Sequence, residues 1–165
     1  MSAETASENV HATAIVVGTA GLLFMGASGS GKSASAFACL AEAAARGVFA
    51  ALIADDQVLV SAHGGAIVAR APVPTAGLME MRGSGIVRLG HISGAVMHLA
   101  VLVGSAGSAQ RLPEPAETVV IGETGSLPAI RLWEGRTSVL ATLAGLRPQL
   151  LPIGGMRAAC PDVPG

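Results

Sequence analysis

The stretch "GLLFMGASGSGKSASAF", residues 21–37, decides the fold of this 165-residue chain. Its centre, "GASGSGKS" at residues 26–33, fits the phosphate-loop (Walker A) pattern G-x-x-x-x-G-K-[ST] at every position. An apolar run precedes the loop, and helix-forming residues follow it. In such a loop, successive backbone N–H groups and the N-terminus of the next helix converge on phosphate oxygens. The stretch therefore predicts a strand, a phosphate-binding loop and a helix, in that order.

Each position of the loop has a predicted role in binding a nucleotide or pyrophosphate. Lys32 supplies a compact positive charge, and the Ser33 hydroxyl is a candidate ligand for Mg²⁺. Lys32 is the only lysine of the chain, whereas the nine other basic residues are arginine. A phosphate loop uses a flexible point charge rather than a planar fork, which explains this single exception. The predicted nucleotide-binding residues are Gly26, Ala27, Ser28, Gly29, Ser30, Gly31, Lys32 and Ser33.

The composition describes a globular chain with a large core. Hydrophobic residues make up 51% of the sequence and charged residues 13%, which excludes the disordered class. A formal net charge of -1 gives no overall field that would attract nucleic acid or an anionic membrane. The apolar stretches 12–25 and 96–103 are too short to span a bilayer. The N-terminus carries acidic residues where a signal peptide carries basic ones, so we expect a cytoplasmic protein.

The residue pattern predicts a single α/β domain. We expect a flexible N-terminus over 1–10, the domain over 11–147 and an irregular tail over 148–165. Strands are predicted at 14–17 and 22–25, joined as a hairpin, and a helix at 32–46 that ends at Gly47 and has the apolar residues Phe37, Leu40 and Ala44 at helical spacing. Residues 50–60, "AALIADDQVLV", are predicted to return as one buried strand, which makes the helix a crossover connection.

The remainder of the chain has weaker signals. Residues 64–88 mix glycine, proline and β-formers, which indicates short strands and turns. We predict strands at 96–103 and 127–132, a polar loop at 105–115 and a last helix at 137–146. Cys39 and Cys160 have no metal or redox spacing and are interpreted as buried or incidental thiols.

Adjacent carboxylates, Asp55 and Asp56, follow the apolar run "ALIA". Alternation along a strand sends their side chains to opposite faces, so we expect different roles. Beside a phosphate loop, one can hold Mg²⁺ directly or through water while the other faces an acceptor hydroxyl. A turn or a helix-capping pair is the structural alternative.

Two further segments carry candidate functional side chains. His11 stands just before the first predicted strand, although a single histidine is more often structural. The segment "EMRGSGI", residues 80–86, combines a carboxylate, a guanidinium and two glycines in one short turn. His63, His91 and His98 have no metal-binding partner at a suitable spacing.

Several phosphate-loop classes are separated by what else they need. The chain has neither the LSGGQ-like segment of ABC-type ATPases nor the N-K-x-D motif of GTPases. Small-metabolite kinases have a similar loop and need an arginine-rich lid late in the chain. Arg131 and Arg136 match such a lid only weakly. A metabolite kinase therefore stays open as a minor alternative.

Four blocks, "NVHATAIVV", "GASGSGKSASA", "LIADDQVLV" and "MEMRGSGIVRL", occur in the order and spacing of one known family. They resemble the catalytic domain of HPr kinase/phosphorylase, over about residues 11–136 and most closely up to residue 88. The resemblance implies a P-loop α/β fold of the phosphoenolpyruvate-carboxykinase-like type, with a mixed sheet and flanking helices. It also implies Mg²⁺-dependent transfer of phosphate from ATP or pyrophosphate to a serine of HPr, the phosphocarrier protein of the phosphotransferase system. The reverse phosphorolysis and a hexameric assembly are further family properties.

The resemblance also implies roles for individual residues. His11, Lys32, Asp56 and Arg111 fall on the catalytic positions, with Asp56 as the acid/base. Ser33 and Glu80 fall on the metal ligands. The supporting positions are Asp55, Arg82, Gly83, Gly85, and, within the stretch linked to dephosphorylation, Arg131 and Arg136.

Departures from the family pattern qualify these expectations. The chain resembles a short form that consists of the catalytic domain alone. The acidic residue that usually follows the loop serine is replaced by Ala34, and the stretch "RLWEGR" at 131–136 lacks its usual prolines. These departures favour the kinase over the phosphorylase direction. They also leave a second hypothesis open, an ATP-sensing regulatory module with weak or no transferase activity.

Overall fold

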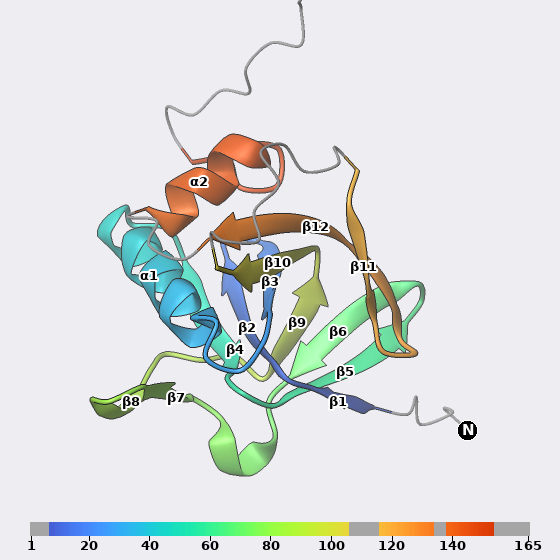
Figure 1. The fold of residues 1–165 in the computed structure, drawn as a ribbon, viewed down its shortest axis with the longest axis horizontal. Helices are drawn as coiled ribbons and strands as arrows, with labels where there is room; N and C mark the ends of the chain where they lie inside the picture. The colour runs from blue at the N-terminus through green and yellow to red at the C-terminus, as the bar shows by residue number, and fades with distance from the viewer. Residues whose placement is uncertain (1–6, 106–115, 134–137, 154–165) are drawn as a thin grey trace, which may run out of the picture.

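The protein is built in three layers (Figure 1). The computed structural model describes residues 7–105, 116–133 and 138–153. Helices α1 (Lys32–Ala45) and α2 (Val139–Leu146) pack on one face of a six-stranded sheet, and a four-stranded sheet covers the other face. The order in the central sheet is β11 (Thr118–Ile121), β12 (Gly125–Trp133), β10 (Leu99–Gly104), β3 (Ala20–Met25), β2 (Ala12–Val17) and β4 (Ala50–Ala54).

The remaining strands form two antiparallel units. The four-stranded sheet has the order β1 (Glu8–Val10), β5 (Val58–His63), β6 (Ala66–Arg70) and β9 (Gly94–Met97). Strands β7 (Leu78–Met81) and β8 (Gly85–Arg88) form a separate hairpin, preceded by the 3-10 turn η1 (Val73–Thr75). Because β1 begins at Glu8, regular structure starts before the domain boundary expected at His11.

The central sheet is mixed. Strand β10 runs parallel to both β3 and β12, whereas β2 is antiparallel to its neighbours β3 and β4. Strands β3 and β4 are therefore parallel to each other, and α1 connects them across β2. This confirms the predicted α/β class and the crossover. Among the described residues the flanking helices cover one face of this sheet, and the second sheet covers the other.

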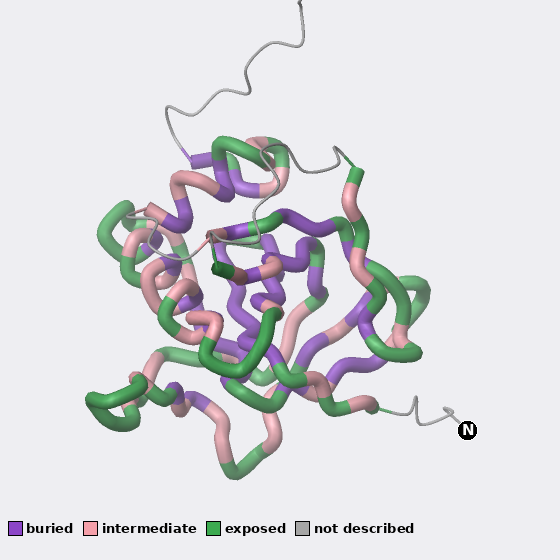
Figure 2. The backbone as a smooth tube through the Cα atoms, in the orientation of Figure 1, coloured by how far each residue is buried: buried purple, intermediate pink, exposed green. Residues whose placement is uncertain are grey.

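Both faces of β2 are buried, so the strand lies between two cores (Figure 2). Ile15 and Val17 point into the core under the helices, and Ala12, Ala14 and Val16 point into the core between the sheets. A strand with two buried faces reads as a continuous apolar run. The single polar member, Thr13, is fully buried.

Helix α1 has nearly the predicted extent. It covers Lys32–Ala45 and is followed by Gly47 with φ +68°, as the expected helix end requires. Besides Lys32, its buried positions are the small residues Ala36, Cys39 and Ala43. Small side chains let the helix lie close to the sheet, while Phe37 and Leu40 stay half-buried and Ala44 is exposed.

Cys39 belongs to the core beneath α1, in agreement with the interpretation of a buried thiol. Burial, with a smaller contribution from the Glu42 carboxylate, raises the pKa of the Cys39 thiol to about 12. The thiol therefore stays protonated at neutral pH. Cys160 lies outside the described residues.

Two runs predicted as single strands are each divided between two sheets. Residues 50–60 form β4 and β5, separated by a bend at Asp55 and Asp56. Residues 96–103 form parts of β9 and β10, separated at His98, whose N–H donates to the Gly21 carbonyl (2.8 Å). In both cases the chain passes from one sheet to the other, and apolar residues are required on each side of the crossing.

The second helix is attached to the first through one carboxylate. Glu42 of α1 accepts hydrogen bonds from the Ser138 hydroxyl (2.8 Å) and the Val139 N–H (2.7 Å) at the start of α2. A carboxylate at a helix N-terminus satisfies free N–H groups and the helix dipole. The predicted strands at 14–17, 22–25 and 127–132 lie within β2, β3 and β12, and α2 begins two residues later than the helix predicted at 137–146. Neither α1 nor α2 is long and apolar enough to cross a membrane, and residues 7–105, 116–133 and 138–153 contain no other α-helix.

Candidate functional site

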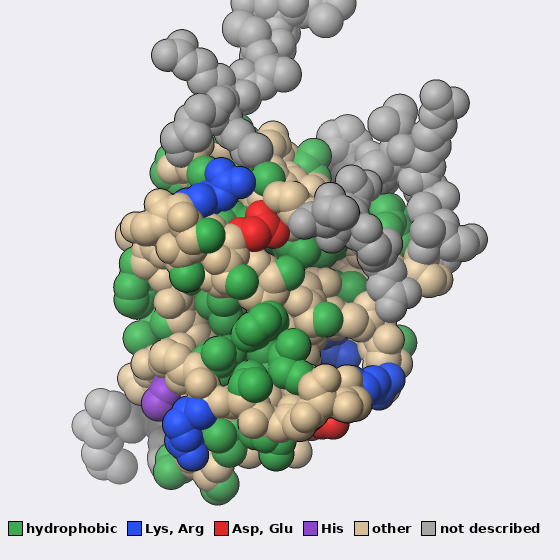
Figure 3. Space-filling view, turned by 90° about the vertical axis from the view of Figure 1, so that its left-hand side faces the viewer, with side chains coloured by type: hydrophobic (Ala, Val, Ile, Leu, Met, Phe, Trp, Pro, Cys, Tyr) green, Lys and Arg blue, Asp and Glu red, His purple; other side chains and the backbone are tan. Residues whose placement is uncertain are grey.

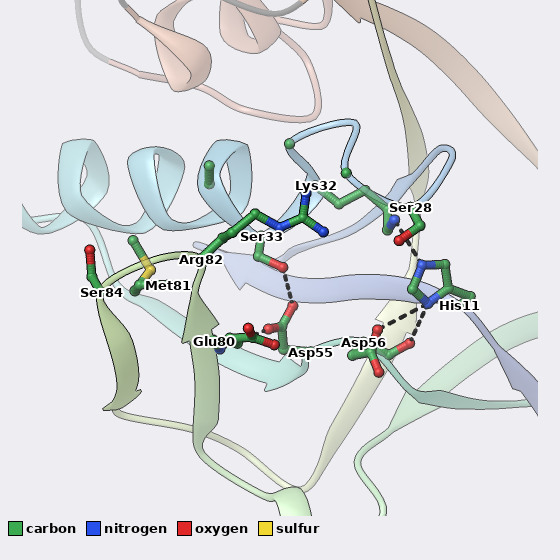
Figure 4. A pocket seen from close by; sticks show the side chains of 13 residues that line it. His11, Ser28, Lys32, Ser33, Asp55, Asp56, Glu80, Met81, Arg82 and Ser84 are labelled. Atoms are coloured by element: carbon green, nitrogen blue, oxygen red, sulfur yellow. Dashed lines mark hydrogen bonds and ion pairs between the residues drawn. The ribbon is translucent and has the colours of Figure 1, made fainter.

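The candidate site lies at one edge of the central sheet, where three chain segments meet. Because β3 and β4 are parallel, their carboxyl ends share this edge, and the antiparallel β2 begins there. The pairings Ala12 with Met25 and Ala14 with Ala54 fix the register. His11, the phosphate loop and the two aspartates consequently lie side by side (Figure 4). They line a pocket of about 380 Å³.

The phosphate loop depends on glycine at the points where its backbone turns. Gly26, Gly29 and Gly31 have φ of +152°, +79° and +90°, a range that side chains disfavour. At Gly26 a Cβ atom would lie only 2.3 Å from the Val103 carbonyl oxygen of β10. Gly31 is the N-cap of α1, so the loop leads directly into the helix N-terminus. The loop therefore has the conformation that its sequence pattern predicts.

Lys32 lies beneath the loop with only 6% of its surface exposed. Its ammonium donates to the carbonyls of Gly26 (3.1 Å) and Ala27 (3.0 Å) and to His11 Nε2 (3.1 Å). Burial lowers the pKa of Lys32, and the nearby Arg82 adds to the lowering, although the Asp56 and Asp55 carboxylates oppose it.

His11 connects Lys32 to Asp56. An ammonium only donates, so Nε2 of His11 accepts, and a neutral ring then carries its proton on Nδ1. Nδ1 faces two oxygens of Asp56, the backbone carbonyl and Oδ1, each at 3.1 Å. Asp56 has φ +66°, the only positive value for a non-glycine residue in the described ranges. His11 thus holds a strained bend whose carboxylate stays 70% exposed.

Asp55 has the opposite environment and connects three elements. It is 7% exposed, and its Oδ1 accepts hydrogen bonds from Thr13 of β2 and Ser33 of α1, each at 2.7 Å. Its Oδ2 accepts the Glu80 N–H of β7 at 3.2 Å. The two aspartates differ in environment as expected, but a bend rather than strand alternation separates them.

The β7–β8 hairpin forms the other wall of the pocket. Glu80, Met81, Arg82 and Ser84 line it, whereas Gly83 and Gly85 shape the turn with φ of +78° and +135°. Figure 4 shows Arg82 extending from β7 toward the phosphate loop, with its guanidinium near Lys32 and Ser33. The pocket therefore combines two cations, Lys32 and Arg82, with three carboxylates.

The oxygen donors beside the loop fit Mg²⁺. The Ser33 hydroxyl and the Asp55 carboxylate are adjacent, and the Glu80 and Asp56 side chains line the same pocket. In the part of the chain that the structure describes, no three His, Cys, Asp or Glu side chains could enclose a metal ion by themselves. Mg²⁺ usually needs no such enclosure, because it retains waters and is shared with substrate phosphates. Ser33 and Glu80, the ligands that the resemblance implies, and Asp55 beside Ser33 are the residues that would hold it.

Sequence reasoning did not identify every residue of the site. Thr13 was missed, although a threonine inside an otherwise apolar strand is a visible signal. Met81 and Ser84 were not singled out either. Arg131 does not line the pocket and pairs with Glu117, with Nε to Oε2 at 3.0 Å. Arg111 and Arg136 lie outside the described residues.

A phosphate loop at the carboxyl edge of a mixed sheet, joined to a buried aspartate and faced by an exposed one, defines a P-loop α/β domain. Comparison with known families agrees with this class. The model of the HPr serine kinase C-terminal domain matches residues 3–100. The chain belongs to this family, as its four sequence blocks indicate.

Two relatives illustrate the range of similarity. HPr kinase/phosphorylase of Mycoplasmopsis pulmonis (strain UAB CTIP) is 39% identical over 85 residues, which are 52% of this chain and 26% of that protein. The match thus spans about a quarter of the curated relative's length. The solved structure of the Hpr(Ser) kinase/phosphatase from Coxiella burnetii superposes with a TM-score of 0.71 at 21% identity. It covers 90% of this chain and 93% of the other, which shows a shared fold.

Proposed function

We propose that the protein is a Mg²⁺-dependent serine kinase that transfers phosphate from ATP or pyrophosphate to a serine of HPr or an HPr-like phosphocarrier protein. Family membership and the names of its relatives support this choice of substrate. By the same resemblance the enzyme acts in the cytoplasm as a homo-oligomer, with six subunits in the family form.

The observation that carries the proposal is the position of the Asp56 carboxylate. It is exposed in the pocket that Lys32 and Ser33 also line, and His11 joins it to Lys32. A site that only binds nucleotide needs the loop and a metal ligand, but transfer also needs a group that faces the acceptor hydroxyl. Asp56 is free to meet an incoming serine, whereas Asp55 is occupied by hydrogen bonds on both oxygens.

The proposed reaction forms one P–O bond and breaks another. The serine oxygen of the carrier attacks the terminal phosphorus of the donor, and the bridging oxygen leaves with the remaining phosphate or nucleotide. Asp56 orients the hydroxyl and accepts its proton, while His11 Nδ1 holds the carboxylate in place. Lys32 neutralises charge on the transferred group. Bound Mg²⁺ would supply further charge neutralisation, with Ser33, Glu80 and Asp55 as the residues that would hold it.

One observation favours a second candidate, an ATP-sensing module with weak or no transfer. Ala34 lines the pocket where the family pattern has an acidic side chain, so one charged group is missing beside the metal ligands. The same absence leads us to expect that the reverse phosphorolysis is the weaker direction.

The test is transfer of labelled phosphate from ATP to purified HPr in the presence of Mg²⁺. We expect wild-type protein to label one serine and Asp56→Asn to lower the rate by about 100-fold or more, with nucleotide binding retained. Binding without any transfer by the wild type would instead support the sensor. Transfer by Asp56→Asn at the wild-type rate would rule out the assigned role of Asp56.

A further inference from the structure

Arg82 lies close to the phosphate loop although it belongs to a different element. A Cβ atom built on Gly29 would lie 3.0 Å from Arg82 Nη1 and 3.8 Å from two further guanidinium atoms. Gly29 is at the crest of the loop and lines the pocket together with Arg82. The absence of a side chain at position 29 therefore leaves room for the guanidinium.

The Arg82 guanidinium has no protein partner within the described residues. Two ion pairs occur there, His11 with Asp56 and Arg131 with Glu117, and no hydrogen bond involves the Arg82 side chain. Three carboxylates, Asp55, Asp56 and Glu80, line the same pocket, yet none is within ion-pair distance of Arg82. The guanidinium instead points toward the loop and Lys32 (Figure 4).

Two cations side by side repel each other unless an anion lies between them. Lys32 is buried and satisfied by loop carbonyls, while Arg82 presents several N–H donors to the open pocket. A guanidinium matches a phosphoryl group with two parallel hydrogen bonds, and an ammonium cannot reproduce that geometry. The arrangement suits an anion that contacts the loop, Lys32 and Arg82 together.

We propose that Arg82 binds the terminal phosphoryl group of the donor next to Lys32, so that the β7–β8 hairpin supplies the second cation of the transfer site. This inference rests on the proposed function for the identity of the donor. It adds a cation from the described residues to Arg111, which the resemblance places at a catalytic position and which lies outside them. It also explains why the hairpin is anchored to Asp55 at Glu80, two residues before Arg82.

The hairpin offers a matched control. Arg88 at the end of β8 is exposed like Arg82 but does not line the pocket. Calorimetry on the full chain should measure binding of Mg²⁺-pyrophosphate, with inorganic phosphate as a smaller probe. We expect Arg82→Met to weaken pyrophosphate binding by about 10-fold and Arg88→Met to leave it unchanged. Arg82→Lys should recover only part of the loss, because the charge returns without the fork.

Transfer kinetics provide the second readout. Contact with the transferred group predicts that Arg82→Met lowers kcat by about 100-fold, more than it changes KM. A thermal unfolding midpoint equal to that of the wild type would show that the hairpin is intact. If Arg82→Met were misfolded, Arg82→Lys would carry the test in its place.

The outcomes separate this inference from the proposed function. Unchanged binding and kcat in a folded Arg82→Met or Arg82→Lys variant would overturn the role of Arg82 and leave the kinase intact. Equal losses in Arg82→Met and Arg88→Met would overturn it as well, since a general charge effect would then suffice. If the wild type did not label HPr but bound pyrophosphate through Arg82, the proposed kinase function would be wrong. The proposed role of Arg82 in anion binding would be retained.

Discussion

The two walls of the pocket are built in different ways. The phosphate loop continues β3, which is buried in the central sheet, and leads into α1. The opposite wall, the β7–β8 hairpin, is a two-stranded sheet of its own, and Ile86 on it is 71% exposed. A space-filling view of the side with α1 and the hairpin shows hydrophobic side chains open to solvent (Figure 3). One wall belongs to the core, and the other is attached to it.

This difference separates two tasks within one site. The loop holds Lys32 and Ser33 in position, because Lys32 donates to the Gly26 and Ala27 carbonyls and Ser33 donates to the buried Asp55 carboxylate. The hairpin is attached to the aspartate bend through the Glu80 N–H and Asp55. Segments with few buried contacts open at a lower free energy than core strands. We therefore expect the loop wall to set the geometry and the hairpin wall to close on the phosphate.

The largest predicted effect is a difference in stability between a methyl group added to the loop wall and one added to the hairpin wall. In Gly26→Ala the new Cβ would meet the Val103 carbonyl of β10 at 2.3 Å, in a φ region of +152°. Strain and overpacking together should lower the free energy of unfolding by about 3 kcal/mol. In Gly83→Ala the Cβ meets nothing within 4 Å, so only the φ of +78° costs energy, about 1 kcal/mol.

Urea denaturation of both variants measures this contrast directly. Gly85→Ala is a useful companion, because Gly85 also has a positive φ and open space around its Cβ. Similar losses at positions 26 and 83 would contradict the difference between a buried loop and an attached hairpin.

A smaller effect is expected where the two walls join. Asp55→Asn replaces one acceptor oxygen by an amide that cannot accept from both hydroxyls and the Glu80 N–H. The unsatisfied donor should cost about 1–3 kcal/mol in unfolding free energy. Amide exchange should then accelerate in β7 and β8 more than in β2 and β3. Asp56→Asn is the matched control, and because that side chain is 70% exposed we expect a change within about 0.5 kcal/mol.

If the two asparagine variants lost equal stability, Asp55 would not be the connection between the walls. Uniform acceleration of exchange across both sheets would also contradict the local effect expected at the hairpin.

Much of this site could be predicted from the sequence because its signals are local. The loop pattern, the helix after it and the β2–β3 hairpin depend on residues within a few positions of each other. Glycines at fixed offsets and a helical run are visible without knowledge of the partner strands. The family resemblance extended these local signals to the aspartates and to the segment at 80–86.

The remaining features depend on distant partners. The bend after β4 was predicted as part of a continuous strand because apolar residues stand on both sides of it. The residues before the bend belong to the six-stranded sheet, and those after it belong to the four-stranded sheet. Asp55 is stabilised by Thr13, 42 positions away, and by Glu80, 25 positions away. The buried face of α1 has no clear local signal, because the small residues Ala36, Cys39 and Ala43 contact the sheet while the large Phe37 and Leu40 stay half-buried. Arg131 was assigned from a loose match, and its pairing with Glu117 has no local signal.

The smallest predicted effect is a pH dependence of pyrophosphate affinity, which distinguishes Lys32 in the loop wall from Arg82 in the hairpin wall. The pKa of Lys32 is lowered from its ordinary value of 10.5, chiefly because burial desolvates the ammonium. A guanidinium, unlike an ammonium, is not deprotonated in proteins. As pH rises through the lowered pKa, the loop loses its charge while the hairpin retains its own, so pyrophosphate affinity should fall before ordinary lysines titrate.

The same shift fixes the sign of the stability change. The unfolded chain holds the lysine proton up to about pH 10.5 and the folded chain releases it earlier, so between the two values the unfolded state binds more protons. The contribution of Lys32 to the free energy of unfolding therefore rises with pH in this window. Since Lys32 is the only lysine, a ¹³C-labelled lysine reports its titration alone. A midpoint at or above 10.5 would contradict the burial of the loop cation, and a pH-independent affinity would place the binding charge on the hairpin.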